Sequence, residues 1–296
     1  MVRIRHNYTE SFQLVSRKMS SYENYTRTSD DYDRTRQAVG IEFIKVGLAR
    51  GSQPLERQVL LDAGCGTGQY SKALLSQVAK IEALDINANM LCHAREKFGQ
   101  TDLTQKISFH ESAISTIPLA DNAVDGVIIN QVLHHLSDSA ANDWQAHRAV
   151  FAELARVLRP GGAIVINSCS HLQLERGFWF YHLIPSALHQ IKERTCDISI
   201  ITQLLFDVGF KAPKNTAAVD IVMQGDAYFN PAGVIDSEWR SGDSIWALAT
   251  EEDLQSAIKT VEQLTTTAAL NRYFETHDQH RSSIGQLTFT SAIRGA

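Results

Sequence analysis

Short apolar runs alternate with amphipathic stretches through the middle of the chain. The apolar runs predict strands at residues 58–62, 80–85, 106–110, 124–130 and 163–167. Between them, apolar positions recur at helical spacing over residues 69–79, 87–98 and 140–158. The run at 124–130 is apolar throughout most of its length, as is typical of a strand covered on both faces. Strands that alternate with helices predict an α/β fold built on a parallel sheet.

The turn between the first strand and its helix carries the clearest chemical signal. Residues 59–68 read Val-Leu-Leu-Asp-Ala-Gly-Cys-Gly-Thr-Gly. Glycines at such a turn let the backbone approach a ligand where any Cβ would clash. The spacing G-x-G-x-G follows Asp62 directly and differs from the G-x-G-x-x-G of dinucleotide sites, whose helix N-terminus binds phosphate. A carboxylate beside the turn favours a ligand with an ammonium or sulfonium group over a pyrophosphate.

A second carboxylate ends the next strand. Asp85 lies 21 residues after Gly64 and closes the run Ile-Glu-Ala-Leu-Asp. A carboxylate at this place can accept hydrogen bonds from both ribose hydroxyls of a nucleoside. The glycine turn, Asp62 and Asp85 together favour S-adenosylmethionine over NAD.

Four segments of the chain resemble the class I S-adenosylmethionine-dependent methyltransferases, and they occur in the expected order. They are Asp62–Gly68, Leu84–Ile86, residues 117–129 and residues 154–166, and the resemblance covers roughly residues 55–170. It implies a doubly wound, Rossmann-like sheet of seven mostly parallel strands with helices on both faces. It also implies S-adenosyl-L-methionine as the cofactor.

The resemblance implies which residues meet that cofactor. Asp62 and the turn are expected at the methionine part, Asp85 at the ribose and Ile86 at the adenine. Alternatively, Asp62 caps the turn and Asp85 starts the next helix. The family often has an acidic residue followed by a small one after strand three, where they meet the adenine amine. The segment His110–Ala113 (His-Glu-Ser-Ala) has no clean acidic match at this place, and Ser112 with Ala113 is the expected placement. The full expected set is Asp62, Gly64, Cys65, Gly66, Gly68, Asp85, Ile86, Ser112, Ala113 and Asn130, with Tyr32 and Arg36 from an N-terminal segment.

Candidate catalytic and substrate residues follow the fourth and fifth strands. His134 and His135 are candidates for a general base because imidazole titrates near neutral pH; alternatively, one of them packs at a helix start. Methyl transfer from a sulfonium requires an in-line nucleophile, and a catalytic residue is not obligatory. Two aromatic segments favour a small ligand, a cation or a planar ring, with ordinary core packing as the alternative. Their candidate residues are Trp179, Tyr181, His182, Trp239, Asp243 and Trp246.

The ends of the chain are expected to complete a single domain, 1–296. We predict a helix at 34–49, a helix at 200–208, a sixth strand at 217–223 and a last strand at 286–293. About sixty residues between these two strands, with helical stretches near 245–248 and 251–273, form with residues 171–196 a helical cap over the substrate pocket. The predicted division is an N-terminal lid segment at 1–35, a cofactor-binding core at 36–170, a cap at 171–285 and the last strand at 286–296.

Composition narrows the choice of partners. The chain has 296 residues, a net charge of −5 and no basic stripe, so a nucleic-acid partner is not expected. No apolar run is long enough to span a bilayer, and the N-terminus lacks the apolar core of a secretory signal. Four cysteines without C-x-x-C or zinc spacing favour reduced thiols, a cytoplasmic location and no metal. The function predicted is methyl transfer to a small-molecule acceptor. A non-catalytic cofactor-binding protein and an NAD-dependent oxidoreductase are the alternatives, and the oligomeric state is not predicted.

Overall fold

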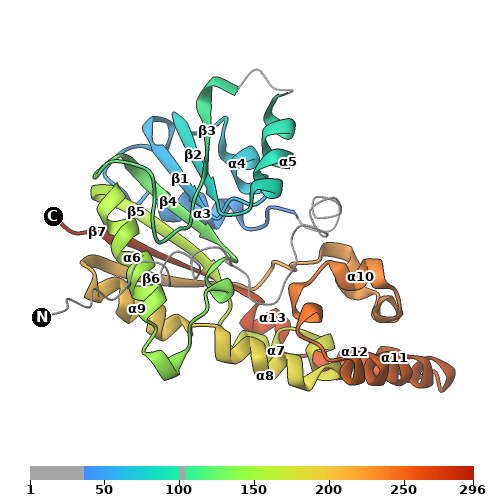
Figure 1. The fold of residues 1–296 in the computed structure, drawn as a ribbon. Helices are drawn as coiled ribbons and strands as arrows, with labels where there is room; N and C mark the ends of the chain where they lie inside the picture. The colour runs from blue at the N-terminus through green and yellow to red at the C-terminus, as the bar shows by residue number, and fades with distance from the viewer. Residues whose placement is uncertain (1–36, 100–103) are drawn as a thin grey trace, which may run out of the picture.

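The computed structural model describes residues 37–99 and 104–296, and it is built on a seven-stranded sheet (Figure 1). The strand order is β3-β2-β1-β4-β5-β7-β6. The strands are β1 (Val59–Ala63), β2 (Lys80–Asp85), β3 (Ile107–Glu111), β4 (Val124–Asn130), β5 (Leu158–Ser168), β6 (Phe210–Ala218) and β7 (Leu287–Arg294). Only β7 runs antiparallel to its neighbours. The order reverses between β1 and β4, and open α/β sheets bind ligands at such a switch point.

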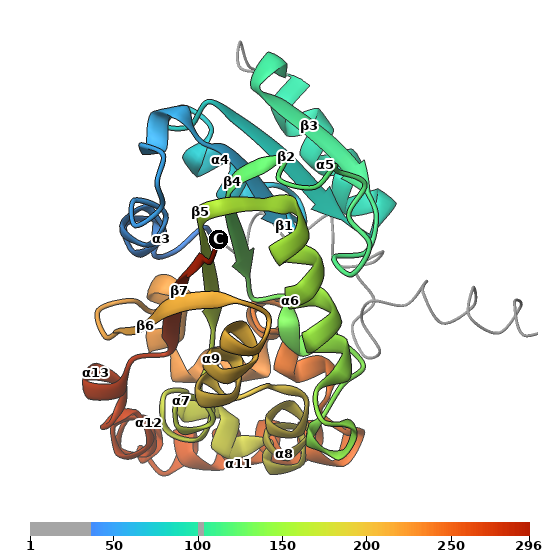
Figure 2. The same cartoon turned by 90° about the vertical axis from the view of Figure 1, so that its left-hand side faces the viewer.

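Helices cover both faces of the sheet, which confirms the predicted doubly wound class. One face carries α3 (Ile41–Leu48), α4 (Gln69–Leu74) and α5 (Ala88–Gly99). The other carries α6 (Gln145–Val157) and α9 (Ile198–Asp207), which lie in front of the sheet in Figure 2. Successive strand residues point to opposite faces, so Leu60 belongs to the first core and Leu61 to the second. Both cores combine aliphatic and aromatic side chains that are buried.

The predicted helical part near the C-terminus is also present. It consists of α7 (His171–Arg176), α8 (Pro185–Arg194), α10 (Ser237–Ser241), α11 (Glu251–Thr266), α12 (Leu270–Asp278) and α13 (Arg281–Ile284). Figure 1 shows these helices gathered beyond one end of the sheet. We call residues 171–194 and 219–284, which contain these helices and the short segments that join them, the cap. The stretch predicted as helical at 251–273 is divided between α11 and α12.

The sixth strand lies earlier in the chain than the hydrophobic pattern predicts. β6 ends at Ala218, and residues 219–223 are not in the strand. β6 is an edge strand whose side chains are mostly exposed, so it carries little of the apolar signal that marks the buried strands. Its pairing with β7 is interrupted between Lys211 and Lys214, where Ala212 has φ 50° and Pro213 follows. Proline lacks the N–H of a sheet ladder and is tolerated at such an edge.

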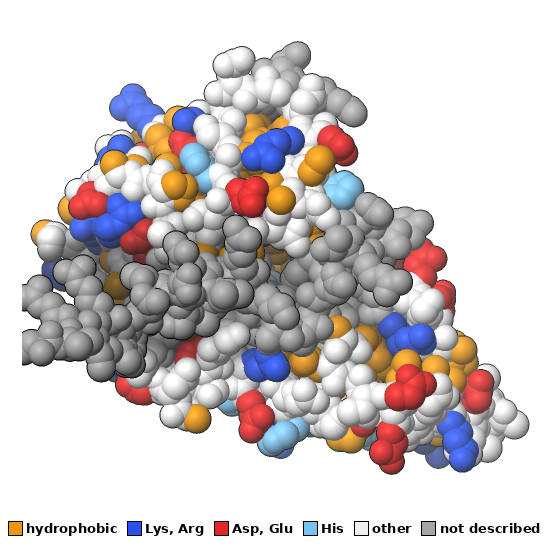
Figure 3. Space-filling view, viewed as in Figure 1, with side chains coloured by type: hydrophobic (Ala, Val, Ile, Leu, Met, Phe, Trp, Pro, Cys, Tyr) orange, Lys and Arg blue, Asp and Glu red, His pale blue; other side chains and the backbone are white. Residues whose placement is uncertain are grey.

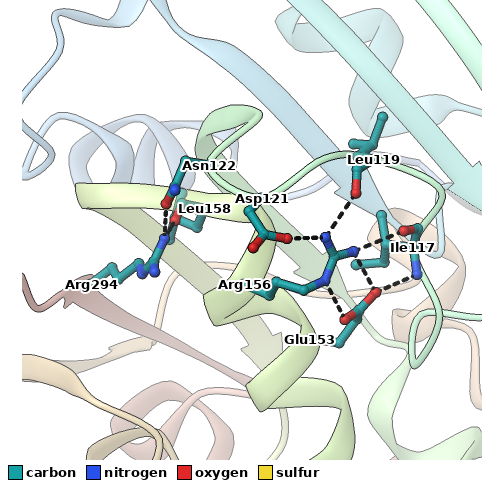
Figure 4. A network of polar contacts seen from close by, with 8 residues as sticks. All are labelled: Ile117, Leu119, Asp121, Asn122, Glu153, Arg156, Leu158 and Arg294. Carbon is teal, nitrogen blue, oxygen red and sulfur yellow. Dashed lines mark hydrogen bonds and ion pairs between the residues drawn. The ribbon is translucent and has the colours of Figure 1, made fainter.

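A network of polar contacts ties α6 to the segment that leads into β4 (Figure 4). Arg156, in the last turn of α6, donates to the carbonyl oxygens of Ile117 (3.0 Å) and Leu119 (2.9 Å). It also pairs with Asp121 at 2.7 Å and with Glu153 at 2.8 Å. Glu153 in turn accepts the backbone N–H of Ile117. One guanidinium therefore holds a loop that has no helix or strand of its own.

We expect Arg156→Met to lower the free energy of unfolding by about 2 kcal/mol, because two carbonyls and two carboxylates lose a charged partner. Arg148→Met on the same helix is the matched control. The two side chains are similarly exposed, at 33% and 39%. Arg148, however, pairs with the carboxylates of Asp143 and Asp207 at the surface and reaches one carbonyl oxygen, that of Asp143, at 3.4 Å. Its replacement should lower the free energy of unfolding much less than that of Arg156. Urea unfolding measures both variants, and equal losses would contradict a special role for Arg156.

Candidate functional site

The glycine turn after β1 has a backbone that only glycine adopts readily. Gly64, Gly66 and Gly68 have φ of 83°, 54° and 78°, in the left-handed region. A Cβ on Gly64 would lie 2.5 Å from Cγ2 of Val132, which follows β4. A Cβ on Gly66 would meet no described atom within 4 Å. The turn is therefore packed tightly on one side and open to a ligand at Gly66.

Asp85 joins the end of β2 to this turn. Its Oδ2 accepts the backbone N–H of Gly66 at 2.8 Å, and its Oδ1 accepts that of Asn87 at 2.8 Å. The carboxyl is buried, and burial raises its pKa. The cap of the following helix is Asn87, whose Oδ1 accepts the N–H of Asn89 and of Met90. Asp85 thus holds the turn, and Asn87 starts α5.

Asp62 lies beneath the same turn but outside the pocket lining. It is buried, and the Ser71 hydroxyl of α4 donates to its Oδ2 at 2.7 Å. Burial raises the pKa of Asp62 to about 7; the Ser71 hydrogen bond opposes this shift and the neighbouring Asp85 charge adds to it. A positive charge placed beside such a carboxyl would lower its pKa, so that the carboxyl is ionised at neutral pH.

The end of β4 presents a buried amide for which the described residues supply no hydrogen-bond partner. Both Nδ2 and Oδ1 of Asn130 are buried, and neither has a hydrogen bond within the part of the chain that the structure describes. Asn130 pairs in register with Asn167 of β5, and the next residue, Gln131, donates to Oδ1 of Asn167 at 3.1 Å. A buried polar group without a partner is costly unless water or a ligand satisfies it. The Asn130 amide therefore marks a place for a polar ligand group.

His134 and His135 follow on a short 3₁₀ helix, Leu133–His135. Their ring centroids are 4.2 Å apart. Both residues line the same pocket as Gly64, Gly66 and Asn130. His135 is buried, and His134 is only partly so. The two imidazoles are thus placed beside the Asn130 amide, at the carboxyl end of β4.

This pocket lies between the sheet and the cap. Tyr181 and Asp243 line it from the cap, and the Tyr181 hydroxyl donates to Oδ2 of Asp243 at 3.1 Å. Among the lining residues that sequence reasoning did not assign to the site are Tyr70, Gln131, Asn167 and Cys169. The signal for Asn167 was present, since it is a polar residue at the end of an apolar strand next to Asn130. Tyr70 and Cys169 carry no such signal.

The other aromatic candidates lie outside the pocket lining. Trp179 is fully buried and donates its Nε1–H to the carbonyl of Tyr228 at 3.0 Å. Trp239 and Trp246 pack against Phe180, with ring centroids 5.2 and 6.0 Å away. We call this set of rings the aromatic core of the cap. His182 stacks on His277 at 4.4 Å, also away from the pocket. The structure thus brings two of the six candidates to the pocket, and the roles of all six stay predictions.

A model of the methyltransferase domain matches residues 61–166, which include the glycine turn, Asp85, Asn130 and both histidines. A protein of Mycolicibacterium smegmatis described as an S-adenosylmethionine-dependent methyltransferase is 28% identical over 187 residues, 63% of this chain and 61% of that protein. Residues 61–166 form a methyltransferase domain of the S-adenosylmethionine-dependent class. The chain spans 27–61% of the length of the first curated relatives it matches.

Solved structures show the same methyltransferase fold. A protein of Anabaena variabilis, described as a methyltransferase from an antibiotic biosynthesis pathway, has a TM-score of 0.69 at 19% identity. The match covers 88% of this chain and 99% of that one. Phosphoethanolamine N-methyltransferase 2 of Haemonchus contortus, solved with S-adenosylhomocysteine, has a TM-score of 0.54 at 14% identity and covers 88% and 54%. The family's cofactor is S-adenosylmethionine.

The residues of this domain fit that cofactor. Gly66 lines the pocket with space for a ligand beside its backbone, and Asp85, which is not in the pocket lining, accepts the backbone N–H of Gly66 from the end of β2. The segment after β3 reaches the same place, because the backbone N–H of Ser112 donates to the carbonyl of Asp85 at 3.0 Å. Ile86 and Ala113 are partly buried beside it. Tyr32 and Arg36 lie outside the described residues.

We expect S-adenosylhomocysteine binding to release a proton below about pH 7. Free Asp62 is largely protonated there, and a ligand ammonium beside it lowers its pKa, so the bound form is ionised. The release should approach one proton per complex near pH 6 and vanish above about pH 8. Calorimetry in two buffers of different ionisation enthalpy measures it. Asp62→Asn should abolish the release, and tight binding without any release would place the ammonium elsewhere.

The described residues can also be compared with the features that metal ions, membranes and nucleic acids require. Within residues 37–99 and 104–296, no three His, Cys, Asp or Glu side chains are grouped to hold a metal ion. A search of the same residues finds no helix both long and apolar enough to cross a membrane. Figure 3 shows Lys and Arg interspersed with Asp and Glu over the described surface of one face.

Proposed function

We propose that the protein transfers a methyl group from S-adenosylmethionine to a small-molecule acceptor by direct displacement. The observation that carries this is one pocket in which the glycine turn and the Asn130 amide face residues of the cap. A concave site lined by apolar side chains and a few polar groups suits a small ligand. The cap side of the pocket, with Tyr181 and Asp243, supports a compact acceptor over a polymer.

The chain's own residues supply position and proton transfer. When bound, the cofactor supplies the methyl group and the sulfur leaving group. In this proposal the Asn130 amide oxygen accepts a hydrogen bond from an N–H or O–H of the acceptor and so orients the lone pair of the nucleophile. His134, which lines the same pocket, takes the proton that this atom loses, and the cap excludes water from the reaction. Holding the reactants in line accounts for most of the catalysis expected of such a site.

The test is a calorimetric titration with S-adenosylhomocysteine, with NADH titrated in parallel. Micromolar binding of the first alone supports the proposed cofactor site, and binding of NADH alone refutes it. A screen of metabolites for release of S-adenosylhomocysteine then tests turnover. Tight binding without turnover of any acceptor would favour the alternative, a cofactor-binding protein that does not catalyse.

We also propose a reducing compartment, such as the cytoplasm, for the protein. All four cysteines are free, and three of them are buried. Disulfides are the usual state of paired thiols in secreted proteins. Mass spectrometry of alkylated protein from cells tests this, and four alkylated thiols are the expected result.

A further inference from the structure

The Asn130 amide has hydrogen-bonding capacity at both of its ends. The residue is 9% exposed and lines the pocket at the carboxyl end of β4. An amide Nδ2 can donate two hydrogen bonds, and an amide Oδ1 can accept two. Among residues 37–99 and 104–296, neither atom of Asn130 finds a partner. Because an unpaired buried polar atom is costly, the nitrogen as well as the oxygen indicates a polar ligand group.

The polar side chains next to Asn130 are bonded to one another. Gln131 has φ 54°, in the left-handed region that residues other than glycine seldom adopt. Its backbone N–H donates to the carbonyl of Asn167 at 3.0 Å, and its Nε2 donates to Oδ1 of Asn167 at 3.1 Å. Nδ2 of Asn167 in turn donates to the Tyr70 hydroxyl at 3.4 Å. Turning Gln131 or Asn167 toward Asn130 would break these bonds, so the fold itself leaves the Asn130 amide unpaired.

An unpaired amide selects a ligand by shape as well as by polarity. Its N–H and C=O groups lie side by side in one plane, so a single ligand edge that meets both must present an acceptor and a donor in that plane. Asparagine and glutamine bind the edge of adenine in DNA by such a pair of bonds. Val39, Leu174 and Leu287 add apolar side chains to the same lining. They provide a surface for the apolar remainder of a flat ligand.

We propose that the acceptor meets Asn130 with a two-point edge, in which one carbon bears both an O–H or N–H and a carbonyl oxygen or ring nitrogen. This rests on the proposed function, since it names the acceptor class of the same site. Oδ1 accepts the hydrogen of the nucleophile, and Nδ2 donates to the neighbouring oxygen or nitrogen. Cyclic amides and hydroxylated nitrogen heterocycles belong to this class. A simple phenol leaves Nδ2 unpaired, and a carboxylate leaves Oδ1 unpaired.

The experiment uses the full chain saturated with S-adenosylhomocysteine and three rings of nearly equal size at pH 7. The probe 2-pyridone presents a donor and an acceptor side by side, whereas phenol presents one hydroxyl and pyridine one acceptor nitrogen. Ligand-observed NMR measures their affinities for the wild type and for Asn130→Leu. We expect Asn130→Leu to weaken the binding of 2-pyridone at least about tenfold and that of phenol and pyridine less than about threefold, because only 2-pyridone pairs with both amide atoms.

The matched control is Asn271→Leu. Asn271 is exposed on α12 and lies outside the pocket lining, so this variant should leave all three affinities unchanged. Leucine is close to asparagine in shape, and replacing an unpaired amide by it should not lower the free energy of unfolding. A lowered unfolding free energy of Asn130→Leu would mean that the amide is paired within the protein, and this overturns the proposal.

The probes can overturn the proposal in three further ways. They do so if the wild type does not bind 2-pyridone, if Asn130→Leu binds it as tightly as the wild type, or if this variant loses affinity for all three rings equally. The last result would mean that Asn130 shapes the pocket without pairing with an edge of the ligand. The proposed function fails on a different measurement, the binding of S-adenosylhomocysteine itself.

Discussion

Asp85→Ala should weaken S-adenosylhomocysteine binding by at least about 100-fold. In the proposed complex the two ribose hydroxyls donate to the Asp85 carboxylate, and a hydrogen bond to a charged group contributes about 1.5–3 kcal/mol. Because each tenfold change in affinity corresponds to about 1.4 kcal/mol, the loss of both bonds weakens binding at least about 100-fold. The turn also loses its link to β2, since the backbone N–H of Gly66 no longer has the Asp85 carboxylate as its acceptor. Calorimetry measures the affinity, and the far-UV circular dichroism melt shows whether the variant is folded.

Glu111→Ala is the matched control for this experiment. Glu111 is exposed, and it is the register partner of Asp85 at the end of the neighbouring strand β3. Its removal should change the affinity less than about twofold. Asp85→Asn keeps one acceptor oxygen and should fall between the two. Unchanged affinity in a folded Asp85→Ala variant would refute the ribose assignment.

The double replacement of His134 and His135 by alanine should lower kcat by about 10²–10⁴, the usual contribution of a general base. The affinity for S-adenosylhomocysteine should change much less, because the turn and Asp85 are untouched. Turnover of the wild type should fall at acid pH as imidazole is protonated, and turnover of the double variant should no longer show this fall. The rate of S-adenosylhomocysteine release, with the acceptor that the metabolite screen identifies, measures both effects.

His189→Ala on α8 controls for the loss of a histidine as such. His189 is exposed and lies outside the pocket lining. Full activity in the double variant would exclude both pocket histidines from the mechanism. A loss of kcat with an unchanged pH profile would mean that they support the structure of the 3₁₀ helix and do not move a proton.

The strands at the centre of the sheet could be predicted because each is buried on both faces and ends in a polar residue. Asp62, Asp85 and Asn130 all mark such ends, which is why sequence reasoning reached the glycine turn and the end of β4. The bounds of β6 could not be found in this way, because this strand lies at an edge of the sheet and its pairing with β7 is interrupted at Ala212 and Pro213. An exposed edge strand needs no hydrophobic alternation to pair.

The aromatic segments show a different limit. Trp179 and Tyr181 are two residues apart, yet one is in the aromatic core of the cap and the other lines the pocket. What separates them is a contact with Tyr228, 49 residues further along the chain. A local sequence pattern cannot identify a contact with a residue so far along the chain. Asp243 was suggested by its aromatic flanks, but its pairing with Tyr181 emerges only from the packing of the cap.

The aromatic core of the cap and the pocket lining are built from different side chains. Trp179, Phe180 and Tyr228 hold the cap together from within, whereas Gly242, Asp243 and Ser244 border the pocket from a short connecting segment. A substitution in that segment therefore leaves the rings that stabilise the cap in place. Under the proposed function, the residues that contact the acceptor can therefore change during evolution with little loss of folding stability, and related proteins can come to methylate unrelated compounds with the same cofactor site.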